Sequence, residues 1–281
     1  MELHILNAIN DYKEKKPIRF HMPGHKADKK FNKLFRQAQI DITELAFSDN
    51  LDNSSGIIEK AEDDIAEILG AKKSFMLTDG SSSGIYSMLK AVKPLGSKII
   101  ICRNSHRSVY NACEILGLEP YVLNHNYKHG IVLPPSLEEI ETLLQRDSEI
   151  IGVLLTSPDY FGNVCNLDKI RTVIKQYNKV LLVDGAHGSH LKFIDDEKLY
   201  AGYYADIWVD GLHKTMPCLT QGALLSTSDD RFIEPLKDAV KYFRTTSPSY
   251  PIMASIEYSV KFMNEIENKE YFKVLLDRIF D

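Results

Sequence analysis

Short apolar runs alternate with longer stretches of helical periodicity along most of the chain after residue 57. The apolar residues between Ile57 and Leu69 recur at helical spacing, and Gly70 follows as a residue that commonly ends a helix. Helix-length stretches also lie at 136–146 and 167–177. Seven runs are short and apolar enough to be strands: 74–78, 98–102, 121–123, 150–155, 180–183, 207–209 and 223–225. This alternation predicts parallel βα units.

The strand-like runs are continuously apolar, which is typical of strands in a sheet that helices cover on both faces. Ligands of such sheets bind at the carboxyl ends of the strands, and the polar clusters of this sequence fall there. The first part of the chain is rich in charge and loops and lacks a strand signal. We therefore expect an N-terminal arm over residues 1–55 and a large domain over 56–281, with two helices after Asp229.

The composition is that of an ordinary globular protein, with 44% hydrophobic and 26% charged residues. The 34 basic and 39 acidic residues leave a net charge of −5, so we expect neither nucleic acid nor a membrane surface as a partner. The N-terminal segment has no long apolar core, which favours a cytoplasmic protein without a signal peptide. The four cysteines (Cys102, Cys113, Cys165, Cys218) are widely separated, which favours reduced thiols.

A polar turn over 78–84 follows the first predicted strand and opens a helix-like segment. It contains Ser81, Ser82 and Ser83, whose hydroxyls would converge with unpaired N–H groups where a helix dipole favours an anion. The segment therefore resembles a phosphate cradle, although it lacks the GxxxxGK[ST] pattern of a Walker loop. For this segment alone, a serine-rich helix cap without a ligand is the alternative.

Two further clusters follow predicted strands. Asp184 comes directly after the run 180–183, where an unpaired carboxylate is costly and a cationic partner such as a pyridinium nitrogen is expected; a plain helix cap is the alternative. His106 follows the run 98–102 and could lie on a conjugated ring or cap the next helix. His187 and His190 lack a third ligand at suitable spacing, so we expect no metal site.

His213 and Lys214 follow the run 207–209, at another strand end. A lysine amine with an ordinary pKa near ~10.4 is almost wholly protonated at neutral pH. It attacks an aldehyde only when its surroundings favour the neutral form. Together, the clusters predict a phosphate cradle, an imidazole platform, a carboxylate and an imine-forming lysine at one edge of the sheet.

With these residues in place, the sequence resembles the bacterial fold-type I ornithine/lysine/arginine decarboxylases, which use pyridoxal 5′-phosphate. The resemblance extends over almost the whole chain. Its ordered motifs lie at 20–26, 41–45, 78–84, 103–108, 156–162, 184–190, 213–215 with 219–221, and 245–250.

The resemblance implies a three-layer α/β fold, the large domain of fold-type I pyridoxal phosphate enzymes, with a mainly parallel but mixed sheet. It implies decarboxylation of lysine, arginine or ornithine. Lys214 would form the cofactor imine, Asp184 would pair with the pyridine nitrogen, and His106 would stack on the ring. Ala186 would pack beneath the ring, and His187 would face the reacting carbon. Ser82, Ser83 and His213 would hold the phosphate, with Ser81 in the same turn; Lys214 or His187 would return the proton.

The resemblance also implies a homodimer or higher oligomer, in which Thr246 or its neighbours reach the partner subunit's phosphate. Two departures stand out. Gly211 replaces the serine of the usual Ser-x-His-Lys pattern, which removes a phosphate hydroxyl. The sequence also stops at Asp281, whereas the family continues into a C-terminal domain. A truncated or degenerate cofactor-binding homologue, or another fold-type I reaction such as transamination, therefore remains the alternative.

Overall fold

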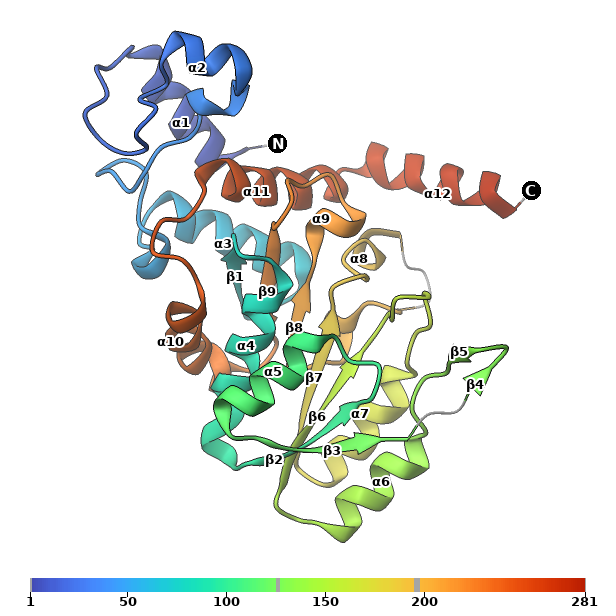
Figure 1. Ribbon diagram of the computed structural model, residues 1–281. Coiled ribbons are helices and arrows are strands. Elements are labelled where there is room, and N and C mark those ends of the chain that lie inside the picture. The colour runs from blue at the N-terminus through green and yellow to red at the C-terminus, as the bar shows by residue number, and fades with distance from the viewer. Residues whose placement is uncertain (1, 125–126, 195–197, 281) are drawn as a thin grey trace.

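A seven-stranded sheet forms the centre of the computed structural model, which describes residues 2–124, 127–194 and 198–280 (Figure 1). The spatial order of the strands is β1-β9-β8-β7-β6-β2-β3. Their bounds are β1 (Lys73–Leu77), β2 (Lys98–Cys102), β3 (Glu119–Leu123), β6 (Ile150–Thr156), β7 (Val180–Gly185), β8 (Ile207–Asp210) and β9 (Ala223–Thr227). All seven predicted strands are present, each within a few residues of its predicted position.

The sheet is mixed but mainly parallel, as predicted. The neighbouring strands β3, β2, β6, β7 and β8 run parallel, whereas β9 runs antiparallel to both β8 and β1. A separate hairpin of β4 (Tyr127–Lys128) and β5 (Ile131–Val132) was not predicted. Its strands have two residues each and are too short to form an apolar run.

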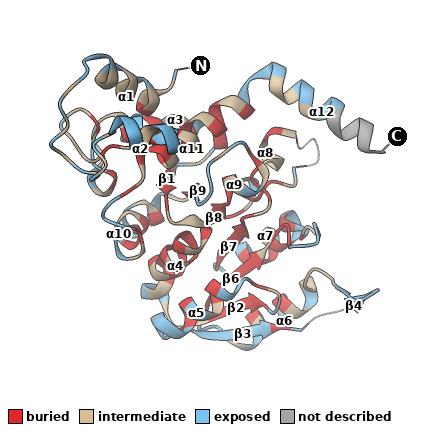
Figure 2. Ribbon diagram, turned by 45° about the horizontal axis from the view of Figure 1, so that its top comes forward, coloured by how far each residue is buried: buried red, intermediate tan, exposed pale blue. Residues whose placement is uncertain are grey.

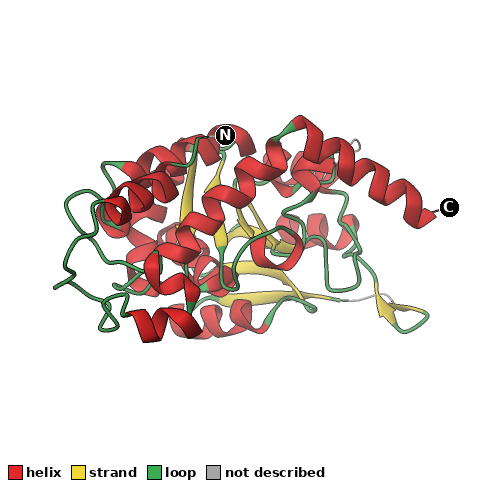
Figure 3. Cartoon of the chain, turned by 90° about the horizontal axis from the view of Figure 1, so that it is seen from above, coloured by secondary structure: helices red, strands yellow, loops and turns green. Residues whose placement is uncertain are grey.

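Helices cover both faces of the sheet, which confirms the three-layer α/β prediction (Figures 1 and 3). One face carries α4 (Gly80–Val92), α5 (Arg107–Leu116) and α10 (Ile233–Phe243). The other carries α3 (Ile57–Leu69), α6 (Leu137–Arg146), α7 (Leu167–Gln176) and α11 (Tyr250–Asn264). Successive strand residues belong to opposite cores: Leu182 packs under the first set of helices and Val183 under the second. The central strands are consequently buried on both sides, whereas the edge strand β3 is largely exposed (Figure 2).

The N-terminal arm contains α1 (His4–Glu14) and α2 (Lys29–Leu34). Helix α1 packs on α3 and α11, and its Ile5 and Ile9 are fully buried in the core of that layer. The carboxylate of Glu257 in α11 accepts hydrogen bonds from the backbone N–H groups of His4 (2.6 Å) and Ile5 (3.0 Å). These N–H groups begin a helix and have no partner inside it. The division of the chain at residue 55 stays a prediction.

Three helices follow Asp229 in the described residues, so the prediction of two was wrong. They are α10, α11 and α12 (Ile266–Phe280). Helix α11 ends because Glu265 adopts extended backbone (φ −67°, ψ 136°). No glycine or proline marks this break, which is why the apolar spacing appeared continuous. The short elements are α8 (Leu191–Ile194), α9 (Leu212–Thr215), and 3₁₀ helices at Arg36–Gln39, Leu51–Asn53, Lys93–Leu95, Ala201–Tyr203 and Asp230–Phe232.

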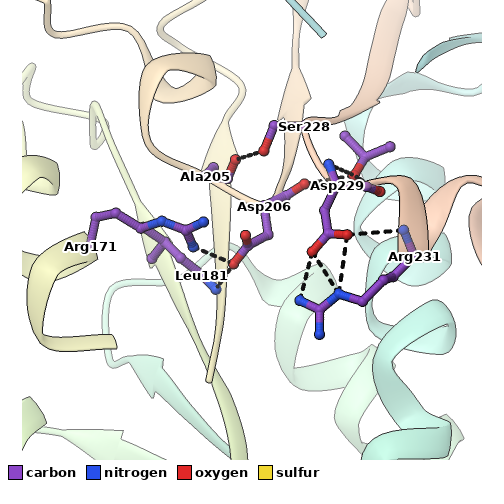
Figure 4. A network of polar contacts seen from close by, with 8 residues as sticks. Arg171, Leu181, Ala205, Asp206, Ser228, Asp229 and Arg231 are labelled. Carbon is purple, nitrogen blue, oxygen red and sulfur yellow. Dashed lines mark hydrogen bonds and ion pairs between the residues drawn. The ribbon is translucent and has the colours of Figure 1, made fainter. Parts of the chain in front are cut away.

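At the amino end of β8, the buried Asp206 carboxylate joins three elements (Figure 4). Its Oδ2 accepts hydrogen bonds from Arg171 Nη1 of α7 (2.6 Å) and from the backbone N–H of Leu181 in β7 (2.8 Å). Ser228, just past β9, donates to the carbonyl of Ala205 (2.7 Å). These polar contacts fix the ends of the central strands opposite the polar clusters of the sequence. Within the described residues, no helix is both long and apolar enough to cross a membrane.

Candidate cofactor and active site

A cavity of about 330 Å³ lies at the carboxyl ends of the central strands. It is lined by Gly80, Ser81, Ser82, Ile85, Asn104, His106, Thr156, Tyr160, Asp184, Ala186, His187, His213, Lys214, Thr220 and Gln221. The structure therefore brings together all the predicted site residues except Ser83. Segments more than a hundred residues apart in sequence meet here because parallel strands end at the same edge of the sheet.

The predicted phosphate cradle is the first turn of α4. Gly80 has a φ of +78°, in the left-handed region that favours glycine, and its N–H donates to the carbonyl of Gln221 (2.9 Å). Ser81 and Ser82 line the cavity beside the helix N-terminus. The buried Ser81 Oγ has no hydrogen-bond partner among the described residues. By contrast, Ser83 is buried outside the cavity lining, and its hydroxyl donates to the carbonyl of Gly80 (2.8 Å).

Asp184 near the end of β7 is a buried carboxylate, 2% exposed. Its Oδ1 accepts a hydrogen bond from the backbone N–H of Ala186 (3.2 Å). Burial raises the pKa of Asp184 above its usual value, while the Ala186 N–H and the charge of Lys214 oppose that rise. No cation of the described chain lies within ion-pair distance of this carboxylate. A cationic ring nitrogen in the cavity would supply that missing charge.

Lys214 and His187 both line the cavity and contact each other. The Lys214 Nζ lies 3.3 Å from the His187 Nε2, although the lysine side chain is exposed. Burial lowers the pKa of His187, and the positive charge of Lys214 lowers it further. The imidazole is therefore neutral near pH 7 and can accept a proton at Nε2. Its Nδ1 is buried and has no partner among the described residues.

Two further histidines line the cavity. His106 caps α5: its Nδ1 accepts from the Ser108 N–H (3.3 Å) and lies 2.8 Å from the Ser108 hydroxyl. Its ring is exposed at the cavity, so capping and covering a ligand are compatible roles. His213 lies in α9 next to Lys214, and its Nδ1 is 3.1 Å from the carbonyl of Gly222. That contact orients the ring through Nδ1 and leaves the other ring nitrogen for a ligand.

Gly211 is required by the close packing of two strand ends. Its φ of −95° is open to any residue, so backbone conformation does not explain the glycine. A Cβ added here would lie 2.5 Å from the carbonyl oxygen of Ala186 and 2.9 Å from Ser81 Oγ. The Ser81 hydroxyl thus lies close to the position that the Cβ of a side chain at residue 211 would occupy.

Five polar side chains of the lining were not predicted as site residues: Asn104, Thr156, Tyr160, Thr220 and Gln221. All five lie near strand ends or beside Lys214, and this position in the sequence could have identified them as site residues. Three lining residues carry a buried polar atom with no partner in the described part of the chain: Ser81 Oγ, Thr156 Oγ1 and His187 Nδ1. Unsatisfied buried groups are rare in folded proteins. They fit a polar, aromatic ligand that carries both an anion and a ring nitrogen, as pyridoxal 5′-phosphate does.

No group of three or more histidine, cysteine, aspartate or glutamate residues suited to a metal ion occurs in the described ranges. All four cysteines are free thiols. Burial raises the pKa of Cys113 to about 11 and that of Cys102 to about 12, which keeps both protonated.

Comparison with known proteins identifies relatives over nearly the whole chain. The family model "Orn/Lys/Arg decarboxylase, major domain" matches residues 4–281. An arginine decarboxylase of Bacillus cereus is 30% identical over 272 residues, which cover 92% of this chain and 59% of that protein. The chain therefore spans about three fifths of the length of this relative.

Solved structures share the fold at lower identity. Lysine decarboxylase A from Pseudomonas aeruginosa superposes with a TM-score of 0.85 at 18% identity, covering 98% of this chain and 42% of that one. A serine palmitoyltransferase from S. paucimobilis, solved with a bound PLP-myriocin aldimine, has a TM-score of 0.58 at 19% identity, covering 73% of this chain and 51% of that one.

Proposed function

Because the chain belongs to the Orn/Lys/Arg decarboxylase family, we propose that it binds pyridoxal 5′-phosphate and decarboxylates lysine, arginine or ornithine. The observation that carries this proposal is the pairing of Lys214 Nζ with His187 Nε2, at 3.3 Å, in the cavity that also contains the buried Asp184. A basic amino acid is proposed as the substrate because the relatives that match are named arginine and lysine decarboxylases.

The chain offers a binding group for each part of the cofactor. Ser81, Ser82 and the N-terminus of α4 would hold the phosphate, since hydroxyls and a helix N-terminus both favour an anion. Asp184 would pair with the ring nitrogen and keep it protonated. His106 and Ala186 would cover the ring, and Lys214 is the amine that would attach its aldehyde. When bound, pyridoxal phosphate supplies an electron sink for the carbanion left by loss of the carboxylate.

Proton transfer is proposed to rest on Lys214 and His187. The lowered pKa of His187 keeps its imidazole neutral near pH 7, so its Nε2 can accept a hydrogen bond from the adjacent Lys214 amine and orient it. The Lys214 amine would attack an aldehyde in its neutral form. The same pair can return a proton to the substrate carbon after carbon dioxide leaves. Asp184 remains ionised while its cationic partner is present, because that charge offsets its burial.

Spectroscopy on the purified protein tests the cofactor assignment. Protein incubated with pyridoxal 5′-phosphate should show a visible absorption band, and borohydride should fix the cofactor on Lys214, as located by peptide mass spectrometry. Lys214→Ala should lose both the band and the fixed label. If Lys214→Ala takes up and retains the label as the wild type does, the assignment is wrong.

Product analysis tests the reaction. The holoprotein is given lysine, arginine and ornithine in turn, and released carbon dioxide and amine are measured together with any keto acid. Carbon dioxide with the matching diamine or agmatine supports decarboxylation. Formation of a keto acid without carbon dioxide would instead identify a transaminase.

We further propose that the active protein is a cytoplasmic homodimer or higher oligomer. Thr245, next to the Thr246 expected to reach a partner, is exposed beside the cradle, where its N–H donates to Asp79 Oδ2 (3.2 Å). The four free thiols suit a reducing compartment. Sedimentation with and without pyridoxal phosphate tests the oligomer: a species of monomer mass at working concentration would contradict it.

A further inference from the structure

The loop after β6 forms one rim of the cavity and is built around Asp159. This side chain is 6% exposed. Its Oδ1 accepts hydrogen bonds from the backbone N–H groups of Phe161 (2.8 Å) and Asn163 (2.9 Å). Its Oδ2 accepts from Asn163 Nδ2 (3.0 Å) and, more weakly, from Asn104 Nδ2 (3.4 Å). Four donors therefore hold the carboxylate in place, and the turn that carries Tyr160 is rigid.

Asp159 has hydrogen bonds but no counter-charge among the described residues. No lysine, arginine or histidine of the described ranges lies within 4.0 Å of it, although other buried carboxylates such as Asp206 and Glu257 have cationic partners. Its negative charge reaches the site, since it helps to oppose the burial that lowers the pKa of His187. A buried carboxylate without a cation favours the binding of one nearby.

Tyr160, the residue after Asp159, is an exposed aromatic side chain that a ligand can contact. The side chain is 83% exposed, yet it lines the cavity. Its ring stands edge-on to His187, with centroids 6.2 Å apart and planes at 82°. His187 therefore neighbours both the tyrosine ring and the Lys214 amine. The tyrosine ring is exposed to solvent and follows Asp159 directly in the chain, and an exposed aromatic face attracts a cation.

We propose that Tyr160, supported by the Asp159 carboxylate, is the subsite of this chain that receives the distal ammonium or guanidinium of a basic amino acid. This inference rests on the proposed function, because it assigns a part of the same cavity to the far end of the substrate. Asp184 is the one carboxylate among the described lining residues, and it lies at the ring-nitrogen end of the proposed cofactor site. The distal cation therefore meets an aromatic ring and a shielded charge at the rim.

The test compares binding of L-lysine, L-arginine, L-ornithine and L-norleucine to the holoprotein. Norleucine is lysine without its distal ammonium, so the ratio of its dissociation constant to that of the tightest cationic amino acid measures recognition of the charge. Binding is followed through the change in the visible absorption of the cofactor, which does not require turnover. We expect Tyr160→Leu to lower the ratio about two- to fivefold, the size of an exposed cation–π contact.

Three further variants separate a specific role from a structural one. Tyr160→Phe keeps the ring and should keep the ratio. Phe161→Leu removes the adjacent exposed aromatic, which does not line the cavity, and should also keep it. Asp159→Asn keeps an acceptor for the two backbone N–H groups but removes the charge, and should lower the ratio severalfold.

The subsite is refuted if the wild type shows no preference for a cationic amino acid, or if Tyr160→Leu weakens lysine and norleucine equally. Failure of the proposed function gives a different result. In that case Tyr160→Leu lowers the preference for a cationic amino acid over norleucine, but the holoprotein releases no carbon dioxide. If the holoprotein releases carbon dioxide but neither Tyr160→Leu nor Asp159→Asn changes the ratio of dissociation constants, the subsite alone is refuted.

Discussion

Replacing Gly211 by serine decides between two explanations of why this chain lacks the usual serine of the Ser-x-His-Lys pattern. If the glycine only reflects the loss of a serine hydroxyl that binds phosphate, Gly211→Ser restores a hydrogen bond to that charged group. Such a bond is worth about 1.5–3 kcal/mol, which corresponds to roughly 10- to 150-fold tighter cofactor binding. If the glycine is required by packing, the same change is harmful.

The geometry favours the second explanation. The new Cβ would lie 2.5 Å from the carbonyl oxygen of Ala186, a backbone atom that cannot rotate away. It would also lie 2.9 Å from Ser81 Oγ. Relief requires the segments that directly follow β7 and β8 to separate, and these segments adjoin Asp184 and Lys214. Overpacking of this kind costs about 1–3 kcal/mol, and the upper part of that range applies because the obstacle is backbone. Cofactor binding should weaken as well, because the displaced residues hold it.

Two measurements on the same samples test this expectation. Urea unfolding of the cofactor-free protein gives the free energy of unfolding, and titration of the visible band gives the cofactor dissociation constant. Gly24→Ser is the matched control, because a Cβ there meets nothing within 4 Å and should change the free energy of unfolding by less than about 0.5 kcal/mol. Tighter cofactor binding by Gly211→Ser with unchanged stability would refute the packing argument.

Two other predictions concern buried carboxylates on opposite faces of the sheet. Asp184→Asn should weaken cofactor binding by roughly 10- to 150-fold, because it removes the charge proposed to pair with the ring nitrogen. It should also stabilise the cofactor-free protein at alkaline pH, since burial raises the pKa of Asp184 and disfavours its ionised form; an unchanged dissociation constant would argue against the pairing. Asp210 accepts hydrogen bonds at Oδ2 from Tyr200 OH (2.7 Å) and Trp208 Nε1 (2.9 Å), and burial raises its pKa from 3.8 to about 7. Because the folded pKa lies above the unfolded one, ionisation of Asp210 removes stability as the pH rises from about 4 to about 7. Asp210→Asn should lose less stability than the wild type in urea unfolding between pH 5 and pH 8, and an equal loss would contradict the assignment.

Much of the sheet could be read from the chain because strands buried on both faces must be apolar at every position. The runs at 150–155 and 180–183 are of this kind and became β6 and β7. The polar clusters could be read for a related reason: a polar residue at the end of such a strand has to face a ligand or a cap. Asp184 and Lys214 were recognisable candidates on that basis.

Contacts between distant segments could not be read in this way. The direction of β9 depends on its neighbours β1 and β8, and an apolar run looks the same in either direction. The hydrogen bonds of Glu257 with the start of α1 join residues more than 250 positions apart. The end of α11 at Glu265 carries no glycine or proline signal.

The sequence by itself determined the layered α/β class, the strand ends where polar groups gather, and the identity of the amine, carboxylate and imidazole that meet there. These follow from local pattern, because burial and periodicity act on neighbouring residues. Only the tertiary structure decided that Gly211 is required by the Ala186 carbonyl, that Asp159 has no counter-charge in the part of the chain that the structure describes, and that Tyr160 lines the cavity. Those properties depend on distances between strands and loops, which no local pattern encodes.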